Sequence, residues 1–321
     1  MRASHICFWI LCSIAAGSAA AQEYPHKPIR LIIPFAPGGS NDIIGRLLAA
    51  RLTTTLGQQV IPDNRAGAGG SIGAELAAKS PPDGYTLVIG HIGTLAVNPT
   101  LYRRLPYHPT TDFAPISTIA KVANIMVVHP SVPAKSVAEF IALAKKQPGA
   151  LSYGSGGTGG AGHLATEYFK LMAKVDITHV PYKGTGPAVV DLMAGQTQLV
   201  FAGVPGIIAH VKSGRLRALG VSTTKRLAVF PDVPTIAEAG VPNFEATQWY
   251  GVLAPAGTPP AIVDKLNKEI ASWVQTKQLQ DRLVADGSEP FTTSPAQFLA
   301  FIKSETARWA PVIKSAHIIV N

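Results

Sequence analysis

Cysteine is nearly missing from this chain of 321 residues, which contains only Cys7 and Cys12. Both lie in an N-terminal segment that we expect to be removed on export, so the mature chain would contain no thiol. That absence excludes cysteine nucleophiles and disulfide bonds. An exported chain without disulfides depends on a hydrophobic core, and this length suffices for one large domain or two medium ones.

Charged residues are also few, at 15% of the chain, with a net charge of +9. The basic residues are scattered, with only short pairs such as Arg103-Arg104 and Lys145-Lys146. Nucleic acid binding would need a clustered basic stripe with interleaved aromatic residues, so we expect no nucleic acid partner. The mild excess of positive charge favours either solubility or attraction of anionic ligands. Beyond the N-terminus no apolar run is long enough to cross a bilayer, so we expect no membrane-spanning segment.

Sequence patterns of common enzyme sites are missing too. Neither glycine-rich segment is followed by Gly-Lys-Ser/Thr, and neither has the spacing of a dinucleotide-binding turn. No Ser-His-Asp order, nucleophile elbow or pair of catalytic carboxylates stands out. His91, His163, His179 and His210 lack metal-ligand spacing, and packing in a helix or core is their ordinary role. These absences predict a protein that is not an enzyme and needs no metal or cofactor.

The N-terminus has the pattern of a secretory signal peptide. Arg2 and His5 precede an apolar run over residues 6–16, and small residues follow over 17–21 with an Ala-x-Ala site. The run is too short to span a membrane, so we expect cleavage after Ala21 and export to the periplasm. The alternative is a buried N-terminal helix.

What the chain does contain is a repeated arrangement of an apolar strand, a glycine-rich turn and a helix start. One copy covers residues 29–42 and a second covers residues 151–164. Helix starts have unpaired N–H groups and a partial positive charge, and glycines let an anion approach that backbone closely. Two such turns far apart in the sequence predict two lobes that close on one small anion.

Several residues of the two turns could contact that anion. Gly38 and Gly39 permit a positive φ, Phe35 could form a wall of the pocket, and Asp42 could hold an N–H or a water near the ligand. In the second turn, Ser155 and Thr158 could donate hydroxyl hydrogen bonds. The alternatives are a plain strand–helix connection with Asp42 as a helix cap, and a surface loop at the second turn.

Alternating strands and helices predict an α/β fold with mostly parallel sheets covered on both faces. The expected strands cover residues 29–35, 59–62, 86–89, 125–129, 151–153, 177–180, 198–201, 216–221 and 250–254. The expected helices cover residues 43–56, 71–78, 137–146, 162–173, 187–194, 207–213, 261–272, 277–285 and 295–315. The tail after Gly251 is almost entirely helical, so we expect it to pack back onto the first lobe.

The order of these motifs resembles the Bug family, the substrate-binding receptors of tripartite tricarboxylate transporters. The resemblance covers essentially the whole mature chain. It rests on Tyr24-Pro25, Lys27-Pro28-Ile29-Arg30, Pro34-Phe35, Pro37-Gly38-Gly39, Asp42, Asn64-Arg65, Gly67, Gly69-Gly70, Pro82-Asp83-Gly84-Tyr85-Thr86, Asn98-Pro99, Asp112-Phe113, Tyr153-Gly154-Ser155, His163-Leu164, Pro181-Tyr182-Lys183-Gly184, Gly186-Pro187-Ala188, Gly214-Arg215-Leu216-Arg217-Ala218 and Pro231-Asp232-Val233-Pro234-Thr235.

The resemblance implies a two-lobed periplasmic-binding-protein type II fold, often called a Venus flytrap, with a carboxylate held between the lobes. Residues 22–122 and 248–321 would form one lobe and residues 123–247 the other. The implied ligand contacts are Phe35, Ala36, Gly38, Gly39, Asp42, His91, Thr94, Ser155, Gly156, Thr158, Gly159, Tyr182, Ala202 and Gly203. Many relatives carry an acidic residue where this chain has Ala202, which argues against an amino-acid ligand.

The expected function is therefore that of a monomeric periplasmic receptor, which delivers a small carboxylate to a two-component membrane permease. Mono-, di- and tricarboxylates and aromatic acids all suit such an anion clamp. A ligand-sensing subunit for a membrane sensor kinase would have the same sequence features. An exported hydrolase of small carboxylic esters and a nucleotide-binding enzyme are further alternatives, and the missing motifs argue against both.

Overall fold

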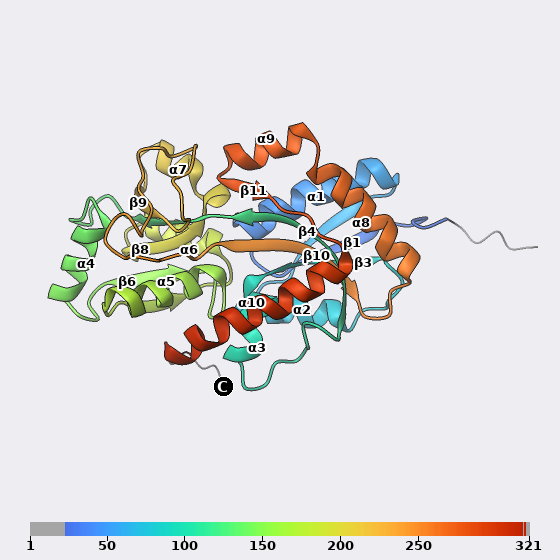
Figure 1. Cartoon of the computed structure of the whole chain (residues 1–321), viewed down its shortest axis with the longest axis horizontal. Helices are drawn as coiled ribbons and strands as arrows, with labels where there is room; N and C mark the ends of the chain where they lie inside the picture. The colour runs from blue at the N-terminus through green and yellow to red at the C-terminus, as the bar shows by residue number, and fades with distance from the viewer. Residues whose placement is uncertain (1–22, 317, 319–321) are drawn as a thin grey trace, which may run out of the picture.

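The computed structural model describes residues 23–316 and residue 318. The predicted signal peptide, with Cys7 and Cys12, lies outside these residues. Within the described part, no helix has both the length and the apolar character needed to cross a membrane. The chain folds into two lobes, each built on one sheet with helices on both faces (Figure 1).

The first lobe is built on a six-stranded sheet in the order β11-β4-β10-β3-β1-β2. Its strands are β1 (Ile29–Ile33), β2 (Val60–Asn64), β3 (Thr86–His91), β4 (Phe113–Val122), β10 (Gln248–Pro255) and β11 (Ser288–Pro290). In β1, Leu31 and Ile33 pack into one apolar layer and Ile32 into the other. Alternate side chains of a strand face opposite sides, so a continuous apolar strand needs helices on both faces.

Those helices form two groups. The helices α1 (Ser40–Leu56), α8 (Pro260–Val274) and α9 (Lys277–Ala285) pack on one face. The helices α2 (Ser71–Ala78) and α10 (Pro295–Ser315) pack on the other. Short helical segments η1 (Ala68–Gly70), η2 (Gly93–Val97) and α3 (Asn98–Leu101) join these elements.

The second lobe is built on a five-stranded sheet in the order β7-β6-β8-β5-β9. Its strands are β5 (Asn124–Val128), β6 (Ser152–Ser155), β7 (Thr178–Pro181), β8 (Leu199–Gly203) and β9 (Arg217–Val221). On one face lie α4 (Val137–Lys146) and α5 (Ala161–Ala173), and on the other lie α6 (Thr185–Met193) and α7 (Ile208–Lys212), which follows η3 (Val204–Gly206).

Both sheets are mixed, which corrects the expectation of mostly parallel sheets. The pairs β1–β2, β1–β3, β6–β7 and β6–β8 are parallel. The pairs formed by β10 with β3 and β4, by β11 with β4, and by β5 with β8 and β9 are antiparallel. Parallel pairing of successive strands needs a crossover, usually a helix. Strand β4 of the first sheet instead leads directly into β5 of the second, and β10 returns to the first sheet beside β4. The chain therefore passes between the two sheets without a crossover helix.

The two chain crossings lie side by side. Gln248, at the start of β10, pairs with Val122 at the end of β4. The last helix adds a third link, because Trp309 of α10 packs edge-on against Tyr168 of α5, with ring centroids 5.8 Å apart. Figure 1 shows α10, in red, running obliquely from the first lobe to beneath the second. The assignment of residues 22–122 and 248–321 to one lobe and 123–247 to the other stays a prediction.

Candidate functional site

Three long helices begin where the two lobes meet, and none has a side-chain cap. Helix α1 begins after Gly39, α5 after Gly160 and α6 after Gly184, without a side-chain hydrogen bond to the first turn. Helices α4 and α10, by contrast, begin at the hydroxyl caps Ser136 and Ser294. First-turn N–H groups have no partner within a helix, so the three uncapped starts leave donors free for an anion.

A narrow cavity, here called the interlobe cavity, lies between these helix starts. Its lining comes from both lobes and consists of Phe35, Asn41, His91, Asn124, Gly156, Gly160, Ala161, Gly162, Thr185, Phe201, Gly203 and Gln248. In the described part of the chain, this lining contains no Asp, Glu, Lys or Arg. Nor do the described residues include a group of three or more His, Cys, Asp or Glu that could hold a metal ion.

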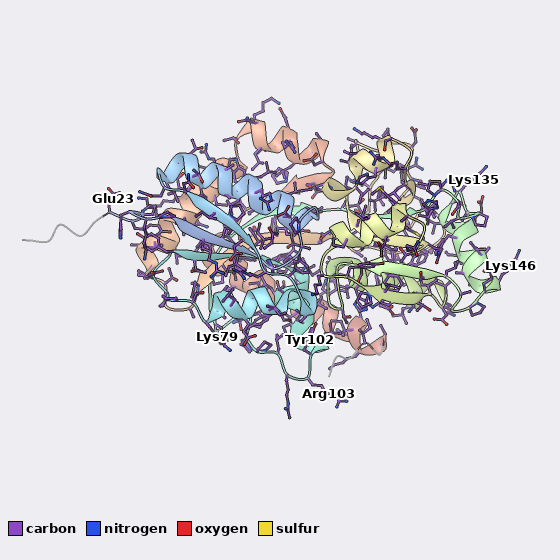
Figure 2. All side chains as sticks on the ribbon, turned by 180° about the vertical axis from the view of Figure 1, so that it is seen from behind. Glu23, Lys79, Tyr102, Arg103, Lys135 and Lys146 are labelled. Atoms are coloured by element: carbon purple, nitrogen blue, oxygen red, sulfur yellow. The ribbon has the colours of Figure 1, made fainter. Side chains whose placement is uncertain are left out.

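The lobes touch around the cavity. The Ala36 N–H donates to the Lys183 carbonyl at 3.0 Å, and the Tyr102 hydroxyl donates to the Thr158 carbonyl at 3.4 Å. Tyr102 lies at this junction, whereas Lys135 and Lys146 mark the far end of the second lobe (Figure 2). The closed arrangement therefore brings the first glycine-rich turn against α6 and the second against η1.

Glycine is required where backbones meet across the lobes. A Cβ on Gly186 would lie 2.3 Å from the Pro37 carbonyl oxygen, and one on Gly69 would lie 2.1 Å from the Thr158 carbonyl oxygen. Real Cβ contacts are never that short, so a side chain at either position would hold the lobes apart.

Aromatic rings form the first-lobe wall of the cavity. The ring of Phe35 lies 4.7 Å from that of His91, which in turn lies 6.1 Å from the ring of Tyr250. Burial lowers the pKa of His91 to about 4, so its ring is neutral at neutral pH. Its Nδ1 accepts the Thr94 N–H at 3.2 Å, which assigns the ring proton to Nε2. Thr94 thus orients His91.

The two chain crossings supply amide side chains to the cavity. The Gln248 Nε2 donates to Asn124 Oδ1 at 2.6 Å, and the Asn124 Nδ2 donates to the Ala246 carbonyl at 2.6 Å. The Tyr250 hydroxyl donates to Gln248 Oε1 at 2.5 Å. The amides are held firmly, since each bond joins residues buried at the hinge.

Asp42 stabilises the first turn from outside the cavity. Its carboxylate accepts from Arg46 Nε at 2.8 Å, from Asn64 Nδ2 at 3.0 Å and from the Gly38 N–H at 3.2 Å. Burial opposes ionisation, but the bonds from Arg46, Asn64 and Gly38 outweigh it and hold the pKa of Asp42 below its usual range. Asp42 therefore fixes the Gly38 turn and is absent from the cavity lining.

Ser155 fixes the second turn in a similar way. Its hydroxyl lies 2.6 Å from His179 Nε2, accepts the Gly157 N–H at 3.2 Å and lies 3.3 Å from the Gly157 carbonyl. A serine–histidine pair could serve a hydrolase, and no sequence motif indicates this one. Ser155 is fully buried, however, and lies outside the cavity lining, so the pair braces the loop.

The second turn is also held by the start of α5. The Gly159 N–H donates to His163 Nδ1 at 3.2 Å, and the rings of His163 and His179 lie 4.3 Å apart. Burial lowers the pKa of His163 to about 4, and burial together with His163 lowers that of His179 to about 3. Both rings are therefore neutral supports of the loop.

The expected contact residues fall into three groups. Four of them, Phe35, His91, Gly156 and Gly203, line the interlobe cavity. Those that form or brace the surrounding turns are Ala36, Gly38, Gly39, Asp42, Thr94, Ser155, Thr158 and Gly159. The remaining two, Tyr182 and Ala202, point elsewhere.

Tyr182 and Ala202 contribute to the opposite layer of the second lobe. The Tyr182 hydroxyl donates to Asp191 at 2.6 Å, and burial together with Asp191 raises its pKa to about 12. Ala202 is buried in the apolar layer under α6, while its neighbours Phe201 and Gly203 face the cavity. Alternation along β8 decides this, since successive side chains face opposite sides.

Sequence reasoning missed the polar side chains Asn41, Asn124, Thr185 and Gln248 of the lining. Asn41 and Thr185 could have been predicted from the sequence, because each lies in the first turn of a helix that follows a glycine-rich turn. Asn124 and Gln248 carried no local signal, since the chain crossings alone bring them together.

A wider space, here called the hinge groove, lies on the other side of the crossings. Thr247 and Trp249 line it, whereas Gln248 between them lines the interlobe cavity. Its walls carry charges of both signs, including Lys121 and Glu289. No start of the long helices α1, α5 or α6 is among the described residues that line it, so its chemistry does not suit an anion clamp.

A known protein family matches most of this chain. The family model described as tripartite tricarboxylate transporter family receptor matches residues 44–318. The chain belongs to this family of receptors. The match confirms the resemblance drawn from the sequence, and it identifies a solute-binding receptor rather than an enzyme.

Individual relatives agree with the receptor family. Protein BugT of Bordetella pertussis is 41% identical over 300 residues, which cover 93% of this chain and 92% of BugT. The structure of R. palustris Rpa4515 with adipate superposes with a TM-score of 0.90 at 42% identity, covering 92% of this chain and 99% of that one. MatC (Rpa3494) from Rhodopseudomonas palustris with bound malate gives 0.86 at 31% identity, covering 90% and 100%. These structures confirm the two-lobed fold of the receptor.

Proposed function

We propose that this receptor captures a small carboxylate in the interlobe cavity, in the periplasm, and delivers it to a tripartite tricarboxylate-type membrane transporter. The observation that carries the proposal is the convergence of α1, α5 and α6 on one cavity, each with an uncapped first turn. A carboxylate there accepts several N–H bonds, and each charge-assisted bond contributes on the order of 1.5–3 kcal/mol.

The electrostatics of the cavity support an anion rather than a cation. The lining described above contains no acidic side chain, and the helix starts carry partial positive charge. Two relatives have carboxylates in their structures: adipate with Rpa4515 and malate with MatC. A carboxylate is accordingly the ligand class that suits this cavity best.

Ligand binding would work through closure of the lobes. The glycine contacts between Gly186 and Pro37 and between Gly69 and Thr158 exist only when the lobes meet. Closure excludes water, which strengthens the hydrogen bonds to the anion. A ligand that binds the closed form better shifts the population toward it, and the closed form would be the state that the permease recognises.

The test is a binding screen on the exported protein. The full chain is expressed with its N-terminal segment, purified from the periplasmic fraction and screened by thermal shift against acetate, propionate, succinate, malate, adipate and citrate. We expect at least one acid to raise the melting temperature, with titration calorimetry giving one site per chain. N-terminal sequencing is expected to begin at Gln22. If none of these acids binds, the proposed function is wrong.

Transport needs a separate experiment. Deletion of the gene is expected to abolish uptake of the radiolabelled acid that the purified receptor binds, and the wild-type gene is expected to restore it. Normal uptake in the deletion strain would favour the sensor-subunit alternative, which predicts binding without transport.

A further inference from the structure

Asn41 presents an unused hydrogen-bond acceptor to the interlobe cavity. It is the second residue of α1, it lines the cavity, and it is only 8% exposed. Within the described residues, no group donates a hydrogen bond to its buried Oδ1. A buried polar atom without a partner is rare and unfavourable, so this oxygen is set to receive a donor from outside the protein.

Among the other amide and imidazole side chains of the described lining, the acceptor atoms are occupied, whereas Thr185 carries a hydroxyl that can both donate and accept. Asn124 Oδ1 accepts from Gln248, whose own Oε1 accepts from Tyr250. The Nδ1 atom of His91 accepts from Thr94, so the ring offers an N–H at Nε2. What these groups still present to the cavity is donors, together with the first-turn N–H groups of α5 and α6.

The cavity thus combines many donors with few acceptors, and among the amide oxygens of its described lining only Asn41 Oδ1 has no donor. We infer that Asn41 determines ligand specificity, by accepting a hydrogen bond from a hydroxyl group that the bound carboxylate carries close to its acid group. The inference rests on the proposed function and names the substrate class of that site, which is the hydroxy acids. A matched acid without the hydroxyl leaves Asn41 Oδ1 buried and unpaired.

An ammonium group could also donate to Asn41, but the surroundings disfavour it. An amino acid would place a cation among three positive helix ends in a cavity whose described lining has no carboxylate. Burying a cation without a counter-charge is far more unfavourable than burying a hydroxyl that has a partner. The order of preference is therefore hydroxy acid, then the unsubstituted acid, then amino acid.

The experiment compares matched acids on matched variants. Titration calorimetry measures the full exported receptor with glycolate and acetate, lactate and propionate, and malate, succinate and aspartate. The variants are Asn41→Ala and, as control on an exposed position of the same helix, Thr54→Ala. Asn41 Oδ1 accepts no hydrogen bond from the described residues, so truncation of this side chain should not disturb the fold, which unfolding in urea checks.

We expect wild type and Thr54→Ala to bind the hydroxy member of a pair roughly tenfold more tightly, the factor given by about 1.4 kcal/mol. In Asn41→Ala the two members should bind equally, at the affinity that wild type has for the unsubstituted acid. Aspartate should bind more weakly than malate and succinate.

Three results would overturn the inference while leaving the proposed function intact. They are equal binding of both members by wild type, a preference that survives in Asn41→Ala, and binding of adipate with no member of any pair bound. Failure of every acid, adipate and citrate included, would instead reject the proposed function, and the inference with it.

Discussion

The hydroxyl oxygen of Ser155 lies 2.6 Å from Nε2 of His179, and this contact ties the glycine-rich loop of the second lobe to the buried layer beneath it. His179 stacks on Tyr153, with ring centroids 4.8 Å apart, and Tyr153 donates to Glu167 of α5 at 2.5 Å. Ser155, His179 and Tyr153 therefore fix the loop that approaches the ligand, and this brace ends on Glu167, which pairs with Lys170 at 2.9 Å. Because the described lining of the cavity holds no Lys or Arg, its positive field comes from the helix starts.

Acid should unfold the receptor through its neutral histidines. The pKa values of His91, His163 and His179 fall from 6.5 to about 4, about 4 and about 3, mainly through burial. Because each folded pKa lies below the unfolded value, the unfolded chain binds protons below pH 6.5 that the folded chain does not bind. As far as these histidines determine it, the free energy of unfolding should thus be greatest above pH 6.5. It should fall between pH 6.5 and about 3, by at most about 1.4 kcal/mol per pH unit for each histidine.

His179→Gln tests this dependence, measured by urea unfolding at several pH values. The groups that face His179 are His163, Glu167 and Lys170. Exposed carboxylates affect wild type and variant alike, so the difference between the two curves isolates the histidine. The variant should lose stability less steeply than wild type below pH 6.5. Parallel curves would show that His179 does not titrate as described.

Asp42→Ala should weaken both the fold and ligand binding. The variant leaves the Gly38 N–H, the Asn64 amide and Arg46 without their shared acceptor, at a cost of about 1–3 kcal/mol in the free energy of unfolding. The Gly38 turn would loosen, so affinity for the acid found in the screen should fall several-fold. Urea unfolding and titration calorimetry measure the two effects.

The control for Asp42→Ala is Asp281→Ala. Asp281 pairs with Lys277 on an exposed helix surface, and such pairs contribute only about 0.3–0.5 kcal/mol. A stability loss in Asp42→Ala without any loss of affinity would show that Asp42 acts only as a helix cap, which is the alternative that the sequence left open.

Glu305→Ala should destabilise the link between α10 and the second crossing. Buried Glu305 accepts from Trp249 Nε1 at 2.9 Å and from Trp309 Nε1 at 3.4 Å. Its loss leaves two indole N–H groups unpaired, at a cost of about 1–3 kcal/mol. Urea unfolding followed by tryptophan fluorescence measures the loss. Glu245→Ala removes an exposed carboxylate 3.9 Å from Arg308 and should change little, so equal losses in the two variants would contradict this role.

The sequence predicts those parts of the fold that carry local signals. The bounds expected for the helices at 71–78, 137–146, 277–285 and 295–315 agree with α2, α4, α9 and α10. Ser136 and Ser294 accept from the first turn of their helices, and a serine just before an apolar periodic segment is a cap signal that a sequence shows directly. Strand β4 was missed because Pro115 and the polar pair Ser117 and Thr118 interrupt its apolar run, and its partners β10 and β11 are distant in the chain.

The site was predictable where it follows a turn and unpredictable where it depends on register. Both glycine-rich turns lie beside the interlobe cavity, which the sequence could indicate because helix starts and glycines are local features. Whether Phe201 or Ala202 faces the cavity depends on the pairing of β8, and a shift by one residue reverses it. Asn124 and Gln248 meet only after both crossings have formed.

Gly186→Ala should separate closure from folding. Gly186 lies in the first turn of α6, where alanine is favoured over glycine by about 0.5–1 kcal/mol. In the closed form, however, the new Cβ would lie 2.3 Å from the Pro37 oxygen. We expect a variant as stable as wild type with at least tenfold weaker ligand binding, because the binding-competent state is less populated. Small-angle scattering should show a larger radius of gyration, and wild-type affinity would contradict closure as the binding step.

Gly69→Ala gives a second test of closure, with a matched control. Gly69 has φ +59° and Gly57 has φ +68°, so alanine at either position carries a similar backbone penalty of about 1–2 kcal/mol. A Cβ on Gly69 would lie 2.1 Å from the Thr158 oxygen of the other lobe, whereas a Cβ on Gly57 would meet nothing within 4 Å. Both variants should lose similar stability in urea, but only Gly69→Ala should lose ligand affinity in titration calorimetry. Equal affinity losses would mean that backbone strain acts through the fold and that lobe contact has no part in binding.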